Sequence, residues 1–335
     1  MYFCLVSFEQ DFFQALQSGS IDFESMALKL FRHQALNVPV YCQFLSYLKI
    51  TPNEITNTSQ IPFLPVSFFK SHQIIRDGIT PSFSFTSSTT TGGIPSQHFV
   101  PDLNIYEWSF TQGFNQFYYS SKYFCVLALL PNYLERSGSS LVYMTQKFID
   151  GSKFKNSNFF MYDFNAVYQQ LVENEKNEIP TLLLGVTYAL LDFAAEFPVP
   201  LKHTVVMETG GMKGKREEMQ RSEIHRELEQ AFQVTSIHSE YGMTELLSQA
   251  YSKGNGIFNC PPWMRVVAAD LHDPLSQLAA AKAGSLNIID LANIYSCAFI
   301  ATDDLGVVHK DGSFEVLGRK DHSDIRGCGL MYQPS

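Results

Sequence analysis

After residue 120 the chain alternates between segments that have the pattern of buried strands and segments that have the pattern of amphipathic helices. Short apolar runs separated by longer periodic stretches are typical of βαβ units, in which successive strands lie parallel. The strand candidates are residues 123–130, 181–186, 203–207 and 234–238, and the helix candidates are residues 165–174 and 213–232. We therefore expect a layered α/β fold with a largely parallel sheet and flanking helices.

The two ends of the chain have other patterns. Residues 1–80 carry apolar side chains at helical spacing, broken near Pro39 and then by Pro52, Pro62 and Pro65, which predicts a helical N-terminal segment with an irregular end. Short strand candidates at 263–269, 284–289, 295–302 and 314–317 predict a smaller β-rich subdomain. We expect an α/β core at residues 81–258, the β-rich part at 259–320 and a short tail at 321–335.

Composition excludes several classes of protein. Of the 335 residues, 45% are hydrophobic and 17% are charged, as in ordinary folded domains, and the formal net charge is -9 without a dense Lys/Arg run. This charge argues against a nucleic-acid or anionic-membrane partner. No apolar run approaches the ~20 residues of a membrane-spanning helix, so we expect no membrane insertion. The N-terminus lacks a basic leader, and the six cysteines are scattered, so we expect a cytoplasmic protein without disulfides or a zinc site.

A hydroxyl-rich loop follows the alternating Phe83 and Phe85, which suggest a strand that runs into it. Residues 86–96 read Thr-Ser-Ser-Thr-Thr-Thr-Gly-Gly-Ile-Pro-Ser. Hydroxyl groups and backbone N–H groups can donate to phosphate oxygens, and glycines let the backbone approach a ligand closely. Such a segment is also typical of a flexible linker. The loop alone leaves both interpretations open.

Three further segments stand at the ends of predicted strands, where ligands bind in open α/β sheets. Residues 208–215 form a glycine turn, residues 240–245 (Glu-Tyr-Gly-Met-Thr-Glu) offer an aromatic ring, a hydroxyl and a carboxylate, and residues 302–304 with 318–321 offer carboxylates and a guanidinium. Magnesium is often bound by one or two protein carboxylates together with substrate phosphates, so Glu245 would suffice. Taken singly, each segment is also explained as ordinary turn chemistry.

In this order the segments resemble the adenylate-forming superfamily of acyl-CoA synthetases, and within it the LuxE-type acyl-protein synthetases. The resemblance covers residues 82–331 and is carried most specifically by Tyr-Gly-Met-Thr-Glu at 241–245. It implies the fold of the superfamily's N-terminal domain and the use of ATP and magnesium. It also implies that Thr244 contacts the α-phosphate and that Glu245 binds magnesium. For the nucleotide it implies three sites. The pyrophosphate would be held by Thr86, Ser87, Ser88, Thr90, Thr91 and Gly92. The adenine would be held by Gly210, Gly211, Tyr241 and Gly242, and the ribose by Asp304 and Arg319.

Gly-Arg-Lys-Asp at 318–321 resembles the superfamily's Gly-Arg-x-Asp hinge motif. The sequence stops soon after it, at Ser335, so we expect no lid domain with a catalytic lysine, as in LuxE-type proteins. The resemblance then implies that a fatty or aromatic carboxylic acid is transferred to Cys328, and from there to a partner such as an acyl reductase or a carrier protein. Basic neighbours could lower the thiol pKa of Cys328, while an inert terminal thiol is the alternative. Two other functions stay open, namely a lidless acyl-CoA ligase and a non-catalytic nucleotide-binding module, the second because Thr89 stands where the family prefers glycine.

Two smaller groups of residues have structural interpretations that are more common than functional ones. His98 and His238 flank the ligand-like segments, but a lone histidine is more often a structural residue with its hydrogen bonds satisfied. Phe110, Phe114 and Phe117 could line an acyl pocket, although core packing is the commoner use of such residues.

Overall fold

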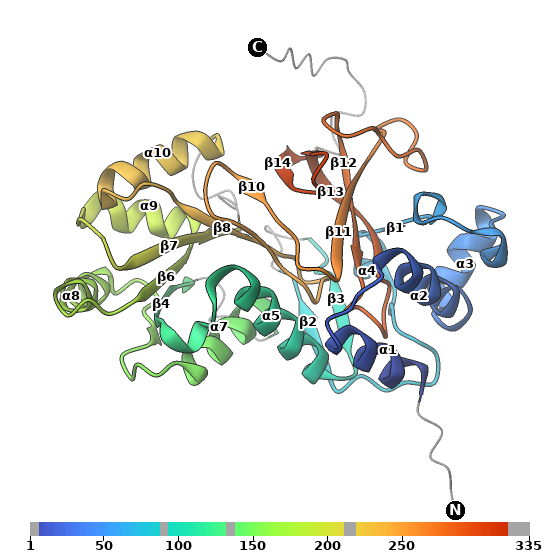
Figure 1. Ribbon diagram of the computed structural model, residues 1–335, viewed down its shortest axis with the longest axis horizontal. Helices are drawn as coiled ribbons and strands as arrows, with labels where there is room; N and C mark the ends of the chain where they lie inside the picture. Colours follow the sequence, from blue (N-terminus) through green and yellow to red (C-terminus); the bar gives the residue numbers. More distant parts are fainter. Residues whose placement is uncertain (1–6, 88–92, 132–137, 211–218, 321–335) are drawn as a thin grey trace, which may run out of the picture.

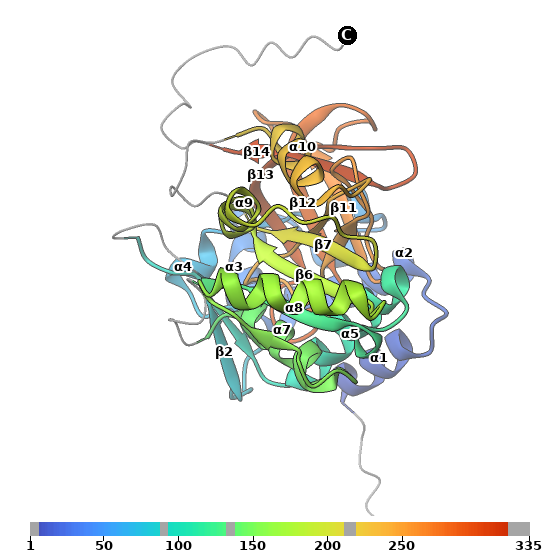
Figure 2. The same ribbon diagram turned by 90° about the vertical axis from the view of Figure 1, so that its left-hand side faces the viewer.

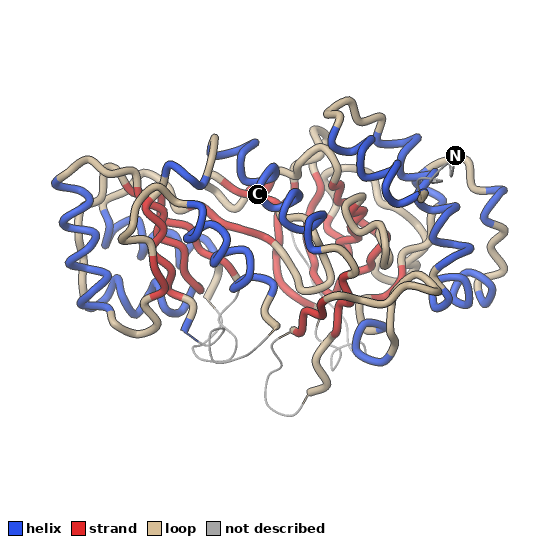
Figure 3. Tube along the Cα trace, turned by 90° about the horizontal axis from the view of Figure 1, so that it is seen from below, coloured by secondary structure: helices blue, strands red, loops and turns tan. Residues whose placement is uncertain are grey.

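A computed structural model describes residues 7–87, 93–131, 138–210 and 219–320 of the chain. In these ranges the strands form three sheets, and the two larger sheets lie in separate halves of the molecule (Figure 1, Figure 3). One half carries a mainly parallel sheet between two layers of helices, and the other half carries an antiparallel sheet that the N-terminal helices cover. The predicted layered α/β fold with a β-rich C-terminal part is therefore confirmed.

The mainly parallel sheet has the order β5-β4-β6-β7-β8-β9 within the described residues. Its neighbours are parallel except β8 and β9, which are antiparallel. β4 and β6 are buried along their whole length, as expected of apolar strands with helices on both faces. The strands are β4 (Cys125–Leu129), β5 (Asn158–Phe159), β6 (Thr181–Val186), β7 (Thr204–Thr209), β8 (His238–Tyr241) and β9 (Ala250–Ser252).

Helices cover both faces of this sheet (Figure 2). One face packs against α5 (Leu103–Tyr118) and α7 (Ser140–Gly151), and the other against α8 (Phe164–Lys176), α9 (Thr187–Glu196) and α10 (Arg221–Phe232). Phe110 and Phe114 of α5 are each 1% exposed, and both rings contact Phe148 of α7. These phenylalanines are therefore core residues, which is the commoner of the two interpretations.

The antiparallel sheet has the order β10-β14-β13-β12-β11 in the described part of the chain. Its strands are β10 (Ile257–Phe258), β11 (Met264–Ala269), β12 (Ala283–Asp290), β13 (Phe299–Val308) and β14 (Phe314–Arg319). A short strand from the N-terminal segment, β1 (Leu64–Pro65), pairs in parallel with β13. The third sheet is a hairpin of β2 (Phe83–Thr86) and β3 (Gln97–Val100), which brackets the hydroxyl-rich loop.

The N-terminal segment is helical, with α1 (Phe8–Gln17), α2 (Phe23–Asn37), α3 (Pro39–Tyr47) and the short α4 (Phe68–Ser71). Ser7 and Gln10 form a capping box at the start of α1, and the side chain of Asp22 caps α2. α2 ends before Pro39 because the residue preceding a proline avoids helical geometry, and Val38 is extended. Short 3₁₀ turns lie at Pro52–Glu54, Thr58–Gln60 and Ser121–Tyr123.

Some expected boundaries were wrong. The strand expected at 234–238 lies at His238–Tyr241, because Ser239 and Glu240 have buried hydrogen-bond partners that an apolar pattern does not reveal. The helix expected from residue 213 begins at Arg221 in the described range, and the strand expected at 295–302 lies at Phe299–Val308. The domain boundaries stay predictions. No helix in the described ranges is both long enough and apolar enough to cross a lipid bilayer.

Candidate functional site

The base of the hydroxyl-rich loop is held closed by two serines. Ser87 N donates to Ser96 O at 3.0 Å, and Ser96 N donates to Ser87 Oγ at 2.8 Å. Thr86 N donates to Gly138 O at 2.8 Å, and a Cβ at Gly138 would lie 2.9 Å from Thr86 Oγ1, so only glycine permits this approach. Thr86 and Ser87 are thus placed at the mouth of the loop. The other predicted cradle residues, Ser88, Thr90, Thr91 and Gly92, lie outside the described residues.

Tyr241, Asp304 and Arg319 meet across the boundary between the two large sheets. Tyr241 at the end of β8 donates its hydroxyl hydrogen to Asp304 Oδ2 at 2.7 Å, and Arg319 Nε lies 3.3 Å from Asp304 Oδ1. Asp304 and Arg319 are register partners on β13 and β14. Burial raises the pKa of Asp304, while the hydroxyl of Tyr241 and the charge of Arg319 offset part of this effect. The structure therefore brings together three residues that lie far apart in the sequence.

The ring of Tyr241 is enclosed by two aromatic neighbours. Phe258 and Phe314 approach it edge to face, with centroid distances of 5.9 and 5.4 Å, and only 8% of Tyr241 is exposed. Burial raises the pKa of Tyr241 well above its usual value, so the phenol stays neutral and remains a donor to Asp304. The ring of Tyr241 is thus held in one orientation beside the Asp304 carboxylate and the Arg319 guanidinium.

Gly242 lies directly beside the carboxyl group of Glu240. A Cβ at Gly242 would stand 2.5 Å from Glu240 Oε1, so a side chain here would displace that group. Glu240 accepts a hydrogen bond from Thr209 Oγ1, and burial together with the charge of Glu208 raises the pKa of Glu240 to about 7. The glycine predicted for the ligand site is therefore also required by packing.

Glu245 lies beside the base of the hydroxyl-rich loop. Its side chain is 5% exposed, and burial raises its pKa, an effect that a hydrogen bond with Ser96 and the charges of Arg319 and Lys70 reduce. The backbone carbonyl of Thr244 is 2.9 Å from His98 Nδ1. The motif at 241–245 and the base of the hydroxyl-rich loop are thus neighbours in space.

The glycine turn after β7 is supported by a buried charged cluster. Thr187 Oγ1 donates to Gly210 O at 2.8 Å and to Glu208 Oε2 at 2.9 Å. Arg221 Nε lies 3.3 Å from Glu208 Oε1. Although burial raises the pKa of Glu208, the hydrogen bond with His225 and the charge of Arg221 lower it overall. The backbone carbonyl of Gly210 is therefore held by the Thr187 hydroxyl. Gly211 lies outside the described residues.

The cysteines differ in their environment. Burial raises the pKa of Cys260 and of Cys297 to about 12, and it also raises the pKa of Cys125. Cys42 on α3 is exposed. Cys328, the predicted acyl acceptor, lies outside the described residues. Of the cysteines that the structure describes, Cys42 is the one that solvent reaches most readily.

Sequence reasoning missed several residues around this site. Asp290 accepts hydrogen bonds from the backbone N–H groups of Leu247 and Ser248, at 2.7 and 3.0 Å, and so holds the segment after Glu245. Asn293 Nδ2 donates to Glu245 O at 2.9 Å. An acidic residue directly after the strand expected at 284–289 was a weak signal for Asp290, but Asn293 gave none. His98 and His238 are both hydrogen-bonded, as the structural interpretation expected.

Several solved structures have a similar fold, and the descriptions of three of them name bound ATP, an AMP conjugate or an adenylate. ATP-bound MatB from Rhodopseudomonas palustris is 15% identical with a TM-score of 0.54, covering 70% of this chain and 47% of its own. A 2-hydroxyisobutyryl-CoA ligase in the postadenylation state, in complex with an acyl-AMP, is 9% identical with a TM-score of 0.61, covering 88% and 66%. At these identities the likeness shows a shared fold. The chain spans about half the length of the MatB structure.

A third structure, McyG A-PCP complexed with phenylalanyl-adenylate, is 16% identical with a TM-score of 0.52, and covers 83% of this chain and 54% of its own. No curated protein is similar enough in sequence to match the chain. The sequence profile of the family described as acyl-protein synthetase, LuxE, matches residues 17–334, which is almost the entire chain. The chain therefore belongs to the LuxE family of acyl-protein synthetases.

Proposed function

We propose that this protein activates a fatty or aromatic carboxylic acid with ATP and then transfers the acyl group to a thiol. In the first step a carboxylate oxygen attacks the α-phosphorus, forming an acyl-adenylate and releasing pyrophosphate. In the second step a thiolate attacks the acyl carbon and AMP leaves. The observation that carries the proposal is the convergence of Tyr241, Asp304 and Arg319 next to Glu245 and the base of the hydroxyl-rich loop.

Each described residue has a role that its environment supports. Asp304 and Arg319 present a carboxylate and a guanidinium to ribose hydroxyls, and the fixed ring of Tyr241 would face the adenine. Thr86 and Ser87 begin the phosphate cradle, Gly210 and Gly242 bring backbone close to the nucleotide, and Thr244 would donate to the α-phosphate. Such a reaction depends on positioning and charge neutralisation more than on a protein nucleophile.

Glu245 would hold magnesium, which neutralises phosphate charge when bound. A single carboxylate fits this role because magnesium keeps several waters and takes its remaining ligands from phosphates. The burial that raises the pKa of Glu245 makes the group easier to protonate in acid, and protonation would release the cation. The Glu245 carboxylate also faces Ser96 at the loop base, where the phosphates would lie.

We propose Cys328 as the first acyl acceptor and a partner protein, such as an acyl reductase or a carrier protein, as the second. A thiol that must attack an acyl-adenylate has to stay reduced, so a cytoplasmic location suits it. The raised pKa values of Cys125, Cys260 and Cys297 make these buried thiols poor nucleophiles. Cys42 is exposed and therefore supplies a matched control.

The test uses the full chain with ATP, magnesium and a labelled carboxylic acid. We expect acid-dependent exchange of pyrophosphate into ATP, and a protein-bound label that hydroxylamine removes. The label should be lost in Cys328→Ala and kept in Cys42→Ala, while both variants retain exchange. Exchange with a thioester formed only on added coenzyme A would instead identify an acyl-CoA ligase. ATP binding by calorimetry without exchange, across straight-chain and aryl acids, would identify a non-catalytic nucleotide-binding protein.

A further inference from the structure

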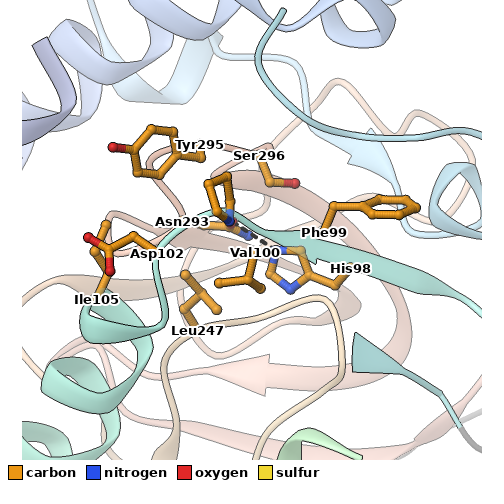
Figure 4. Close-up of a pocket in the computed structure, with 10 residues that line it drawn as sticks. His98, Phe99, Val100, Asp102, Ile105, Leu247, Asn293, Tyr295 and Ser296 are labelled. Atoms are coloured by element: carbon orange, nitrogen blue, oxygen red, sulfur yellow. Dashed lines mark hydrogen bonds between the residues drawn. The ribbon is translucent and has the colours of Figure 1, made fainter. Parts of the chain in front are cut away.

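The segment Thr244–Glu245 is held by two side chains from other parts of the fold, His98 and Asn293. Figure 4 shows these two side chains next to each other. His98 of β3 places Nδ1 at 2.9 Å from Thr244 O, and Asn293, after β12, donates from Nδ2 to Glu245 O at 2.9 Å. His98 Nε2 is 3.1 Å from Asn293 Oδ1, so the two side chains are also in contact. A carbonyl oxygen can only accept a hydrogen bond, so Nδ1 of His98 is the donor to Thr244.

The element that carries His98 is the one that carries the hydroxyl-rich loop. β3 is paired with β2 from Thr86 and Gln97 onward, and the loop lies between these two residues. The side chain of Ser96, two residues before His98, lies beside the Glu245 carboxylate and offsets part of the rise in its pKa. The hairpin thus contacts the motif at two points, one on the Thr244 backbone and one on the Glu245 side chain.

The ring of His98 has little freedom to move. It is fully buried and packs edge to face against Phe69 of α4, with the ring centroids 5.8 Å apart. On its other side, Asn293 is anchored through its backbone, because Gln34 of α2 donates to Asn293 O at 2.8 Å. A donor held from both sides fixes the position of the carbonyl that it binds.

We propose that His98 is a positioning residue for acyl-adenylate formation. Its hydrogen bond to Thr244 O sets the Thr244 hydroxyl and the Glu245 carboxylate at a fixed distance from Ser87 and Ser96, which form the base of the hydroxyl-rich loop on the same hairpin. The inference rests on the proposed function, since it assigns His98 to the site that would hold the α-phosphate and magnesium. A misplacement of about 1 Å by a residue remote from the chemistry can cost roughly a hundredfold in rate.

Two substitutions at position 98 test the roles of the two ring nitrogens separately. The amide of asparagine can place a donor near the position of Nδ1, and that of glutamine near the position of Nε2. We expect His98→Asn to keep the kcat of pyrophosphate exchange within about threefold of the parent, and His98→Gln to lower it about tenfold or more, with a smaller change in the KM for ATP. Both remove a buried ring, so both should lower the melting temperature by similar amounts.

A merely structural histidine would give a different result. Equal kcat values for the two variants, or kcat values that follow their melting temperatures, would overturn the positioning role while the parent protein still catalyses exchange. If His98→Gln does not fold, Nδ1-methylhistidine at position 98 removes the same donor and keeps the ring, and it should lower kcat in the same way.

Failure of the proposed function gives a separate signature. If the parent protein shows no exchange, the dissociation constant for magnesium and ATP, measured by calorimetry, decides the question. Weaker binding in His98→Gln than in His98→Asn supports the placement of Thr244 and Glu245 at the phosphates. Equal binding in the two variants, or no binding by the parent protein, overturns it.

Discussion

At the scale of single residues, Glu240 couples the ligand motif to pH. Burial raises its pKa to about 7, compared with an ordinary 4.5. As the pH rises, Glu240 therefore loses its proton in the unfolded chain before it does so in the folded protein. The stability that is present below pH 4.5 is then lost as the pH rises toward the folded pKa of about 7. The difference between the two pKa values corresponds to about 3 kcal/mol.

We predict that Glu240→Gln removes this loss of stability at higher pH. A glutamine oxygen can still accept the Thr209 hydrogen bond, but it carries no charge. Urea unfolding should therefore give similar free energies for variant and parent at pH 4, and a variant that is more stable by about 3 kcal/mol at pH 8. Glu227→Gln on the exposed side of α10 controls for the change in net charge. A gap that stays constant between pH 4 and pH 8 would contradict the buried, protonated state of Glu240.

Residues of the candidate site could be proposed from the sequence where chemistry and spacing are local, and their roles stay predictions. Tyr241, Gly242 and Glu245 belong to one short motif, and the structure places this motif against the loop at 86–96. His98 and Asn293 could not be assigned from sequence, because their partner atoms are backbone carbonyls more than 45 residues away along the chain. A backbone carbonyl leaves no mark in the sequence, so only the tertiary structure reveals this kind of contact.

At the scale of elements, α1 is attached to the fold by a small charged cluster. Glu9 Oε1 lies 2.8 Å from Arg76 Nε and 2.9 Å from His33 Nε2, and its side chain is 2% exposed. Burial raises the pKa of Glu9, but hydrogen bonds and the charges of Arg76 and His33 lower it overall below its ordinary value. The ionised Glu9 carboxylate therefore stabilises the fold above its ordinary pKa of 4.5. This stabilisation is lost as the pH falls through the lower pKa that Glu9 has in the folded protein.

Glu9→Gln should loosen α1 at neutral pH. Removing the charge leaves Arg76 with a weaker partner, which costs about 1–3 kcal/mol. Compared with the parent, hydrogen exchange at pH 7 should become faster in Phe8–Gln17 and should stay unchanged in α9. α9 packs against the parallel sheet, whereas the ion-pair partners of Glu9 are Arg76 and His33. The stability difference from the parent should shrink as the pH falls through the folded pKa of Glu9, because the carboxylate then becomes protonated in both states. Uniformly faster exchange in all helices would show instead that the cluster supports the entire fold.

The strands of the parallel sheet were predictable because their residues are apolar throughout, and β6 was found with its observed bounds. The predicted position of β8 was wrong because His238, Ser239 and Glu240, three of its four residues, are polar and have hydrogen-bond partners on other elements. Polar strands at a ligand site are thus the elements that an apolar pattern describes least well. The same property makes them suited to present polar groups to a ligand.

At the scale of the whole molecule, one core joins the two halves. A single cluster of buried apolar residues includes Phe12 of α1, Phe110 of α5, Leu182 of β6 and Phe299 of β13. A second cluster lies on the other face of the parallel sheet under α8, α9 and α10. Since β4 and β6 are buried on both faces, the two clusters share the same strands. The sequence predicted separate domains, but it could not show that their apolar faces merge.

We predict that the described parts of the chain unfold together, although chains above about 150 residues often do not. The two tryptophans report on the junction between the halves: Trp108 of α5 and Trp263 have ring centroids 4.5 Å apart, and Trp263 Nε1 donates to Ser109 Oγ at 2.9 Å. Urea midpoints from tryptophan fluorescence and from far-UV circular dichroism should coincide. Ser109→Ala removes this hydrogen bond and the one between the Ser109 and Ser248 hydroxyls. It should lower both midpoints equally, with a loss of about 1–3 kcal/mol in the free energy of unfolding. A fluorescence midpoint that falls alone would mean that the junction opens first and that the halves are separate folding units.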